Sequence, residues 1–140
     1  MRTHILLLML LLTACSVKSQ KDMNSFFEID FQDFFKNDTI SFEIEHQSIF
    51  KNVIVNSDFS TGLTELTIKV VFNGDGGVVK SGTKSIEIKK IDNPIEINVY
   101  LNGHQSKYTI DLKQGRYIGL SKKSKTSFDF YQEKEPFEYD

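Results

Sequence analysis

Five segments of the chain alternate apolar and polar residues with period two, the pattern of a strand with one face in a core and the other in water. In residues 39–46, for example, Ile40, Phe42 and Ile44 share one face, while serine and glutamate side chains occupy the other. The same alternation predicts strands at residues 64–72, 84–91, 95–101 and 107–112, and less regular runs predict strands at 49–55, 116–120 and 126–131. About eight strands are therefore expected.

Turn signals separate these segments. Asn102-Gly103 lies between two alternating runs, and Asn-Gly favours a type I′ hairpin turn, because both central residues of that turn have positive φ. Residues 73–77, Ser81-Gly82 and 92–94 break the chain in the same way. Short strands joined by such turns are typical of an all-β, antiparallel β-sandwich, either immunoglobulin-like or transthyretin-like. The absence of βαβ alternation argues against a parallel sheet.

Residues 26–35 fit two structures. Phe27 and Phe31 lie on one face of a strand together with Ile29, but they also lie on one face of a helix together with Phe34 and Phe35. Periodicity does not choose between strand and helix. Clustered aromatic residues usually pack in a core, and the alternative is an exposed aromatic patch that grips a partner.

Residue choice favours strands. The only alanine, Ala14, lies before the predicted cleavage point, and the chain after that point holds 13 isoleucines against five leucines. Alanine and leucine are strong helix formers, whereas isoleucine suits a pleated, half-buried surface.

The N-terminus has the layout of an export signal. Arg2 precedes an apolar run at residues 5–12, and small residues follow it. This run is much shorter than the roughly 20 residues that a membrane-spanning helix needs, so we expect it to be removed.

The end of that signal, Leu12-Thr13-Ala14-Cys15, resembles the lipobox of bacterial lipoproteins. The resemblance covers only the signal and its cleavage point. It implies that a peptidase cuts before Cys15 and that the Cys15 sulfur carries a diacylglyceryl group, so that membrane lipid is the first partner. Two or three acyl chains anchor a protein firmly. Cys15 is the only cysteine, so it has no partner for an internal disulfide, and lipidation accounts for it.

Three regions follow from this interpretation: a signal at 1–14, a lipidated flexible tether at 15–24 and one β-sandwich domain at 25–140. The tether is mostly polar and lacks an apolar period. Ser16 replaces the aspartate that retains many lipoproteins in the inner membrane, so the resemblance favours the outer membrane. We therefore expect a lipid-anchored protein of the cell envelope.

Charge gives little direction. Without residues 1–14 the chain carries 16 Lys and Arg against 19 Asp and Glu, a formal charge of −3. A mildly acidic domain has no electrostatic footprint for nucleic acid, and nucleic acid is not an expected partner. Lys122, Lys123 and Lys125 are expected to form a solvated basic loop, with anionic lipid or glycan as the alternative ligand.

Catalytic and metal-binding patterns are not found in the sequence. His46 and His104 are read as surface residues at turns. The loop at 73–77 contains one acid, Asp75, whereas calcium sites usually need several, so a hairpin loop is expected and no metal or cofactor. The acidic segment 133–140 is expected to be a tail or an edge segment shielded by Pro136.

The expected function is that of a non-enzymatic binding or envelope-structural module with a protein or glycan partner, because sandwich scaffolds often present loops or an edge strand. One alternative is an accessory subunit of a larger envelope complex. The other is a small hydrolase, which would require carboxylates such as Asp30, Asp33, Glu43 and Glu45 to converge in one pocket.

Overall fold

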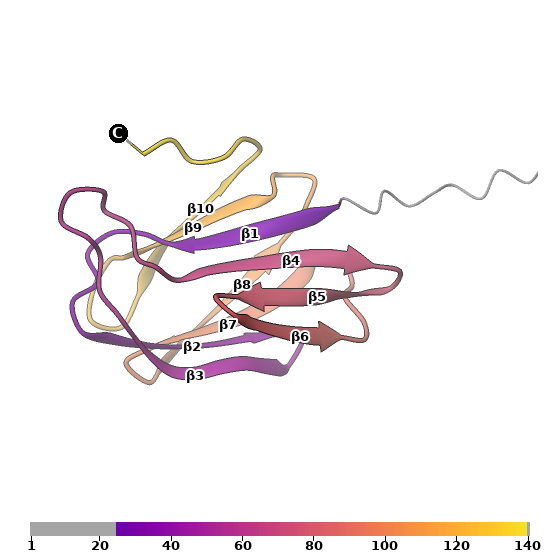
Figure 1. Ribbon diagram of the computed structural model, residues 1–140, viewed down its shortest axis with the longest axis horizontal. Coiled ribbons are helices and arrows are strands. Elements are labelled where there is room, and N and C mark those ends of the chain that lie inside the picture. Colours follow the sequence, from indigo (N-terminus) through magenta and orange to yellow (C-terminus); the bar gives the residue numbers. More distant parts are fainter. Residues whose placement is uncertain (1–24, 140) are drawn as a thin grey trace, which may run out of the picture.

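A computed structural model describes residues 25–139, and the predicted signal, Cys15 and the tether lie outside this part of the chain. Across residues 25–139 Figure 1 shows two stacked sheets and no helix, so the predicted all-β sandwich is confirmed. No membrane-spanning helix is found among residues 25–139. The described part of the chain forms ten strands: β1 Phe26–Phe31, β2 Asp38–Ile44, β3 Gln47–Val55, β4 Thr67–Asn73, β5 Gly76–Ser81, β6 Lys84–Ile88, β7 Ile95–Leu101, β8 His104–Ile110, β9 Tyr117–Lys122 and β10 Phe128–Glu133.

One sheet has six strands in the order β10-β9-β1-β4-β5-β6, and the other has four in the order β3-β2-β7-β8. All neighbours are antiparallel except β1 and β9, which run parallel. The predicted antiparallel arrangement therefore holds for every neighbouring pair but this one. The two strands are far apart in sequence, so β9 can enter beside β1 from the same end without the crossover that joins consecutive parallel strands.

The ambiguous segment 26–35 begins as strand β1. Phe27, Ile29 and Phe31 are fully buried, because β1 lies between β4 and β9 and its backbone pairs on both sides. The chain turns after β1, where Phe34 has a φ of 72° and Asn37 a φ of 50°. The first part of this segment therefore follows the alternating period of a strand and not the period of a helix.

The sequence predicts no strand at the position of β5, and residues 76–77 fall within the loop predicted at 73–77. Gly76 and Gly77 belong to the strand, and only Gly74 and Asp75 form the turn before it. A Cβ on Gly76 would lie 2.1 Å from the Ile88 carbonyl oxygen, so glycine here permits close approach of two backbones.

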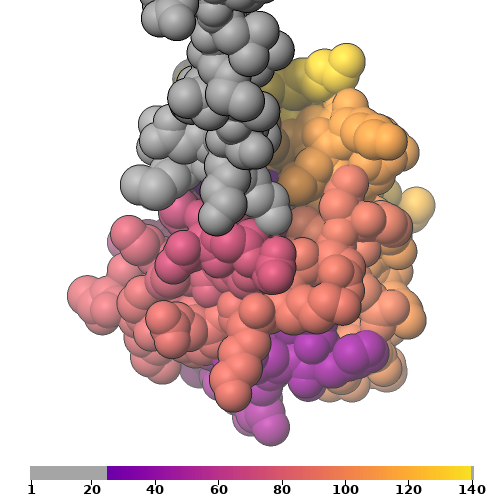
Figure 2. Space-filling view, turned by 90° about the vertical axis from the view of Figure 1, so that its right-hand side faces the viewer, coloured from indigo at the N-terminus to yellow at the C-terminus, as the bar shows by residue number. Residues whose placement is uncertain are grey.

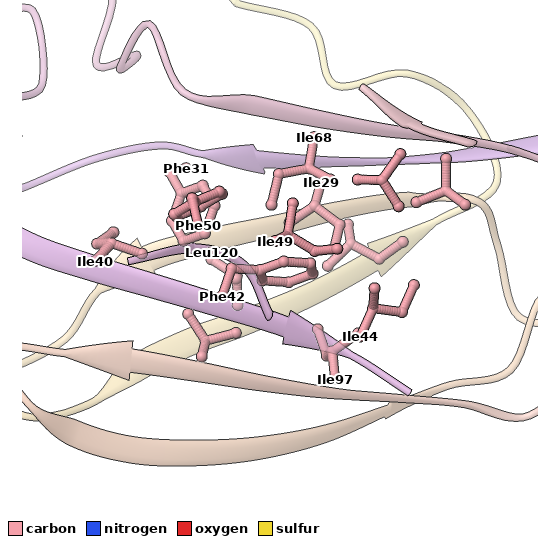
Figure 3. Packing of buried hydrophobic residues seen from close by; sticks show 14 of the residues in the cluster. Ile29, Phe31, Ile40, Phe42, Ile44, Ile49, Phe50, Ile68, Ile97 and Leu120 are labelled. Atoms are coloured by element: carbon pink, nitrogen blue, oxygen red, sulfur yellow. The ribbon is translucent and has the colours of Figure 1, made fainter. Parts of the chain in front are cut away.

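The core lies between the inner faces of the two sheets (Figure 3). Phe42 of β2 stacks on Phe50 of β3 at a centroid distance of 5.9 Å. One open side of the sandwich is closed by Tyr108 of β8 and Phe130 of β10, whose rings stack at 4.8 Å. Fully burying a Phe or Ile side chain contributes about 1.5–3 kcal/mol, so this layer is the main source of stability.

The two ends of the sandwich differ. At the N-terminal end, which faces the viewer in Figure 2, the described chain begins at Ser25, whose carbonyl accepts a hydrogen bond from Phe72 N. The β4–β5 turn and residues 90–93 line the same hollow as Ser25. The opposite end carries the β1–β2 loop, residues 32–37, and the β3–β4 loop, residues 56–66 (Figure 1). We call this opposite end the loop end.

Candidate functional site

The two loops of the loop end are bound to each other. Phe35 N donates to Ser57 Oγ at 3.0 Å, and Ser57 N donates to the Phe35 carbonyl at 2.9 Å. Asn37 N donates to Asn56 Oδ1 at 2.8 Å. These bonds join the loops into one surface.

Asp58 holds the tip of the β3–β4 loop in a fixed shape. Its Oδ1 accepts hydrogen bonds from Ser60 N at 2.8 Å and Thr61 N at 3.1 Å, and its backbone N donates to the Leu63 carbonyl at 2.7 Å. The Ser60 and Thr61 hydrogen bonds lower the pKa of the Asp58 carboxyl, which is therefore ionised at neutral pH. The tip is ordered before any partner arrives.

Large apolar side chains project from this ordered surface. Phe59 at the loop tip is fully exposed, Phe34 is 74% exposed, and Ile54 at the end of β3 is 67% exposed. Phe35, next to Phe34, is instead buried against Phe31 and Phe128. The aromatic run predicted from sequence thus divides into core residues and one exposed residue.

Phe34 is also strained. Its φ of 72° lies in the left-handed region, which a bulky side chain rarely adopts and which costs of order 1–3 kcal/mol. Strain of this kind persists where the surrounding structure imposes it, and it occurs often at binding sites. Here it accompanies an aromatic ring held in water.

A hollow of about 550 Å³ lies between the end of β3 and the β3–β4 loop. Apolar walls are provided by Ile54, Leu63 and Leu66, while Asp58 and Glu65 also line it. A larger hollow of about 1020 Å³ lies at the N-terminal end and is bordered by Ser25, so the chain toward Cys15 leaves from its rim. The loop end therefore offers a hollow away from the N-terminal end of the sandwich.

Lys122 does not belong to a solvated basic loop, which corrects the sequence prediction. It is the last residue of β9, its side chain is 18% exposed, and its Nζ lies 2.6 Å from Asp38 Oδ2. Lys123 pairs with Asp129 at 3.3 Å. Lys125 is held through its backbone: its carbonyl accepts a hydrogen bond from Asn102 Nδ2 at 3.1 Å.

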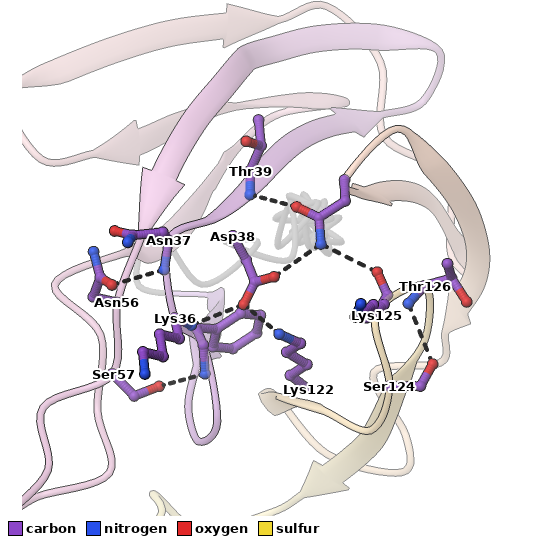
Figure 4. A network of polar contacts seen from close by, with 12 residues as sticks. Lys36, Asn37, Asp38, Thr39, Asn56, Ser57, Lys122, Ser124, Lys125 and Thr126 are labelled. Atoms are coloured by element: carbon purple, nitrogen blue, oxygen red, sulfur yellow. Dashed lines mark hydrogen bonds and ion pairs between the residues drawn. The ribbon is translucent and has the colours of Figure 1, made fainter.

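Asp38 is the centre of a network below the loop end (Figure 4). It accepts hydrogen bonds from Asn102 Nδ2 and Lys36 N, each at 2.8 Å, in addition to the Lys122 contact. Burial alone would raise the pKa of Asp38, but these hydrogen bonds and the Lys122 charge outweigh it and lower that pKa. The network ties β2 and the β7–β8 turn to the end of β9 and so fixes the base of the loop end.

The four carboxylates of the hydrolase alternative do not share a pocket. Asp30 lies on the outer face of the six-stranded sheet, where it accepts a hydrogen bond from Thr67 Oγ1 at 2.9 Å. Glu43 lies on the outer face of the other sheet and contacts Tyr100 OH at 3.2 Å. Asp33 follows β1 at the loop end, whereas Glu45 lies in the β2–β3 turn at the N-terminal end.

Both histidines lie where the sequence placed them. His46 is exposed in the β2–β3 turn, with Nε2 3.6 Å from Glu96 Oε1, and His104 is exposed at the start of β8. Asp75 lies in the β4–β5 turn, and residues 25–139 bring together no group of three or more potential metal ligands.

The C-terminal segment is tied down rather than free. Tyr139 OH accepts a hydrogen bond from Gln32 Nε2 at 2.9 Å and donates to Asp30 Oδ2 at 3.3 Å. Gln32 is buried beside Gly119, where any Cβ would collide with the Gln32 amide. Sequence analysis gave no signal for this contact, because it joins residues more than a hundred positions apart.

Comparison of the chain with protein-family models, curated proteins and solved structures finds no match. The choice between an immunoglobulin-like and a transthyretin-like sandwich therefore stays a prediction.

Proposed function

We propose that this protein is a lipid-anchored, non-enzymatic binding module of the bacterial cell envelope, attached through Cys15 and favoured in the outer membrane. The anchor rests on the lipobox resemblance of Leu12-Thr13-Ala14-Cys15. The loop end would be the surface that binds, because the chain leads toward Cys15 from the other end of the sandwich.

The observation that carries the binding role is the exposure of Phe59 and Phe34 on ordered loops. Isolated exposed apolar residues are common. Two exposed aromatic rings on neighbouring, hydrogen-bonded loops, one of them with a strained backbone, are unusual for a surface that contacts only water. Aromatic residues on rigid supports are also the usual anchors of protein interfaces. Binding therefore accounts for both the exposure and the strain.

The test is photocrosslinking in the producing cell. A benzophenone amino acid replaces Phe59 in one variant and Tyr131, an exposed residue of β10, in a matched control. The proposal expects a discrete adduct from position 59 that is absent from position 131. Equal labelling at both positions, or no adduct at position 59, would reject the loop end as the binding surface.

The anchor has its own test. Intact mass of membrane-extracted protein should correspond to a chain that begins at Cys15 and carries acyl chains, and the Cys15→Ser variant should lack that species. A wild-type chain without acyl groups, or one that retains residues 1–14, contradicts the anchor and leaves the crosslinking result unaffected.

A further inference from the structure

We infer that the partner of the loop end is a polypeptide segment that presents an apolar side chain flanked by lysine or arginine. This inference rests on the proposed binding function and adds the chemistry of the partner. It follows from the hollow at the loop end, the charges around it and the fixed shape of its rim.

The lining of the hollow favours an apolar side chain of the partner. Ile54, Leu63 and Leu66 provide its apolar walls, and its volume of about 550 Å³ accommodates one or two side chains of a peptide. Phe59 follows directly on Asp58, which lines the same hollow, so a segment seated there can also cover the Phe59 ring. Burial of these apolar surfaces on binding provides the hydrophobic contribution to the binding free energy.

The acidic side chains at the edge of the hollow, here called its rim, favour a positively charged partner. The two loops of the loop end carry three acids, Asp33, Asp58 and Glu65, against one base, Lys36. The β9–β10 loop at the same end adds Lys123 and Lys125, but no lysine of the described chain lines the hollow. Within residues 25–139 none of these three acids forms an ion pair, and Asp58 and Glu65 are exposed at the hollow. A lysine or arginine beside the seated apolar residue would meet both carboxylates, which gives charge complementarity and faster association.

The rim is rigid, which lowers the entropic cost of binding. The Asp58 hydrogen bonds to Ser60 and Thr61 close the tip, and Gly62, with a φ of 68°, leaves room for the Asp33 carboxylate where a Cβ would otherwise lie. Because the loop is already formed, less conformational freedom is lost when a partner docks.

The same charges disfavour two other occupants. Asp58 and Glu65, the two carboxylates at the hollow, would repel a bacterial membrane with anionic lipids, since exposed like charges interact unfavourably. A second copy that docked through the same end would bring Asp58 and Glu65 toward their own symmetry mates. A basic, apolar peptide avoids both costs.

The experiment selects a displayed library of short random peptides on the purified domain, with the variant Phe34→Ser/Phe59→Ser as the counter-selection target. We expect enriched peptides that combine an apolar residue with lysine or arginine. For a synthetic peptide of the enriched sequence, Phe59→Ser should weaken binding at least about tenfold, as for an interface anchor. Glu65→Lys should weaken it several-fold, whereas Glu135→Lys, a matched change on the exposed C-terminal segment, should leave it unchanged.

Enriched peptides without a basic bias, or equal binding by the Phe34→Ser/Phe59→Ser variant, would overturn the inference. The chain has no tryptophan, so Phe59→Trp gives a unique fluorescent reporter for the rival occupants. A blue shift with phosphatidylcholine or phosphatidylglycerol vesicles would assign the surface to lipid, and a dimer in sedimentation that Phe59→Ser abolishes would assign it to a second copy. Either result overturns the inference.

The two proposals can fail separately. An adduct at position 59 in the cell together with no basic bias among selected peptides rejects the chemistry inferred here and retains the binding role. No adduct at position 59 rejects the binding role itself.

Discussion

Lys122 Nζ lies 2.6 Å from Asp38 Oδ2, so the last residue of β9 in one sheet is paired with the first residue of β2 in the other. Asp38 is buried, and Asn102 satisfies its second oxygen. The pair therefore links the two sheets at the base of the loop end.

Replacement of Asp38 by alanine should lower the free energy of unfolding by about 3 kcal/mol, because it leaves the Lys122 ammonium poorly solvated and several donors unpaired. Urea denaturation followed by circular dichroism measures this change. The matched control is Lys90→Met, which removes the exposed pair with Asp92 and should not move the transition. An equal effect of the two substitutions would contradict the role given to the Asp38 network.

The contribution of Asp38 should depend on pH. Its pKa is lowered in the folded protein, so the folded state binds the proton less readily than the unfolded chain, whose aspartates titrate near about 4. The stability difference between wild type and Asp38→Asn should stay constant from pH 8 to about pH 5 and shrink below about pH 4. Urea transitions at several pH values test this. A difference that is already lost by pH 6 would show that another group is responsible.

Gly76 should not tolerate a side chain. In Gly76→Ala the new Cβ would meet the Ile88 and Lys89 carbonyl oxygens at 2.1 and 2.7 Å, and backbone atoms cannot move aside cheaply. We expect a loss of about 3 kcal/mol in thermal or urea unfolding. Gly82→Ala is the control, because its site is open and only its φ of 56° opposes alanine, at about 1 kcal/mol.

Tyr139 should titrate well above the ordinary range of a tyrosine. Burial raises the pKa of its phenol to about 12, and the neighbouring Asp30 carboxylate adds to this although the Gln32 hydrogen bond opposes it. Ultraviolet absorbance at 295 nm should show a phenol with this pKa in wild type and not in Tyr139→Phe. Since the unfolded phenol ionises near about 10, the Tyr139 contribution to stability is lost as pH rises from about 10 to 12.

Phe34→Gly should stabilise the fold. Glycine adopts the φ of 72° without strain, and the exposed ring gives up little packing, so a gain of about 1 kcal/mol is expected. The same variant should lose affinity for the loop-end partner. Phe35→Gly provides the contrast, because that ring is buried and its removal should cost about 3–5 kcal/mol. A destabilised Phe34→Gly would mean that the ring serves the fold.

The alternating pattern predicted most strands of the sandwich, because a strand with one buried face needs an apolar residue at every second position. The hairpin at Asn102-Gly103 was also predicted from sequence, and both residues have the positive φ that a type I′ turn requires. In β5, by contrast, Gly76 and Gly77 resemble a loop signal, and their role depends on the distance to Ile88, which no local pattern contains.

The proposed binding surface was only partly predictable. An exposed aromatic patch within residues 26–35 was one of two alternatives, and one ring of that run, Phe34, is exposed. Phe59 carried no signal, because a single aromatic residue in a polar loop has no period. The Asp38–Lys122 pair was hidden in the same way, since the two residues are 84 positions apart in sequence.

The place of β1 in the sheet has a mechanical consequence. β1 lies between β4 and β9 rather than at an edge, and it is the strand that joins directly to the chain leading toward Cys15. Tension transmitted along that chain would pull β1 lengthwise, so that the ladders on both sides resist in shear instead of opening one hydrogen bond at a time. Under the anchor and the binding role proposed above, a domain held by its N-terminus in this way would carry load on a partner without unravelling from its first strand.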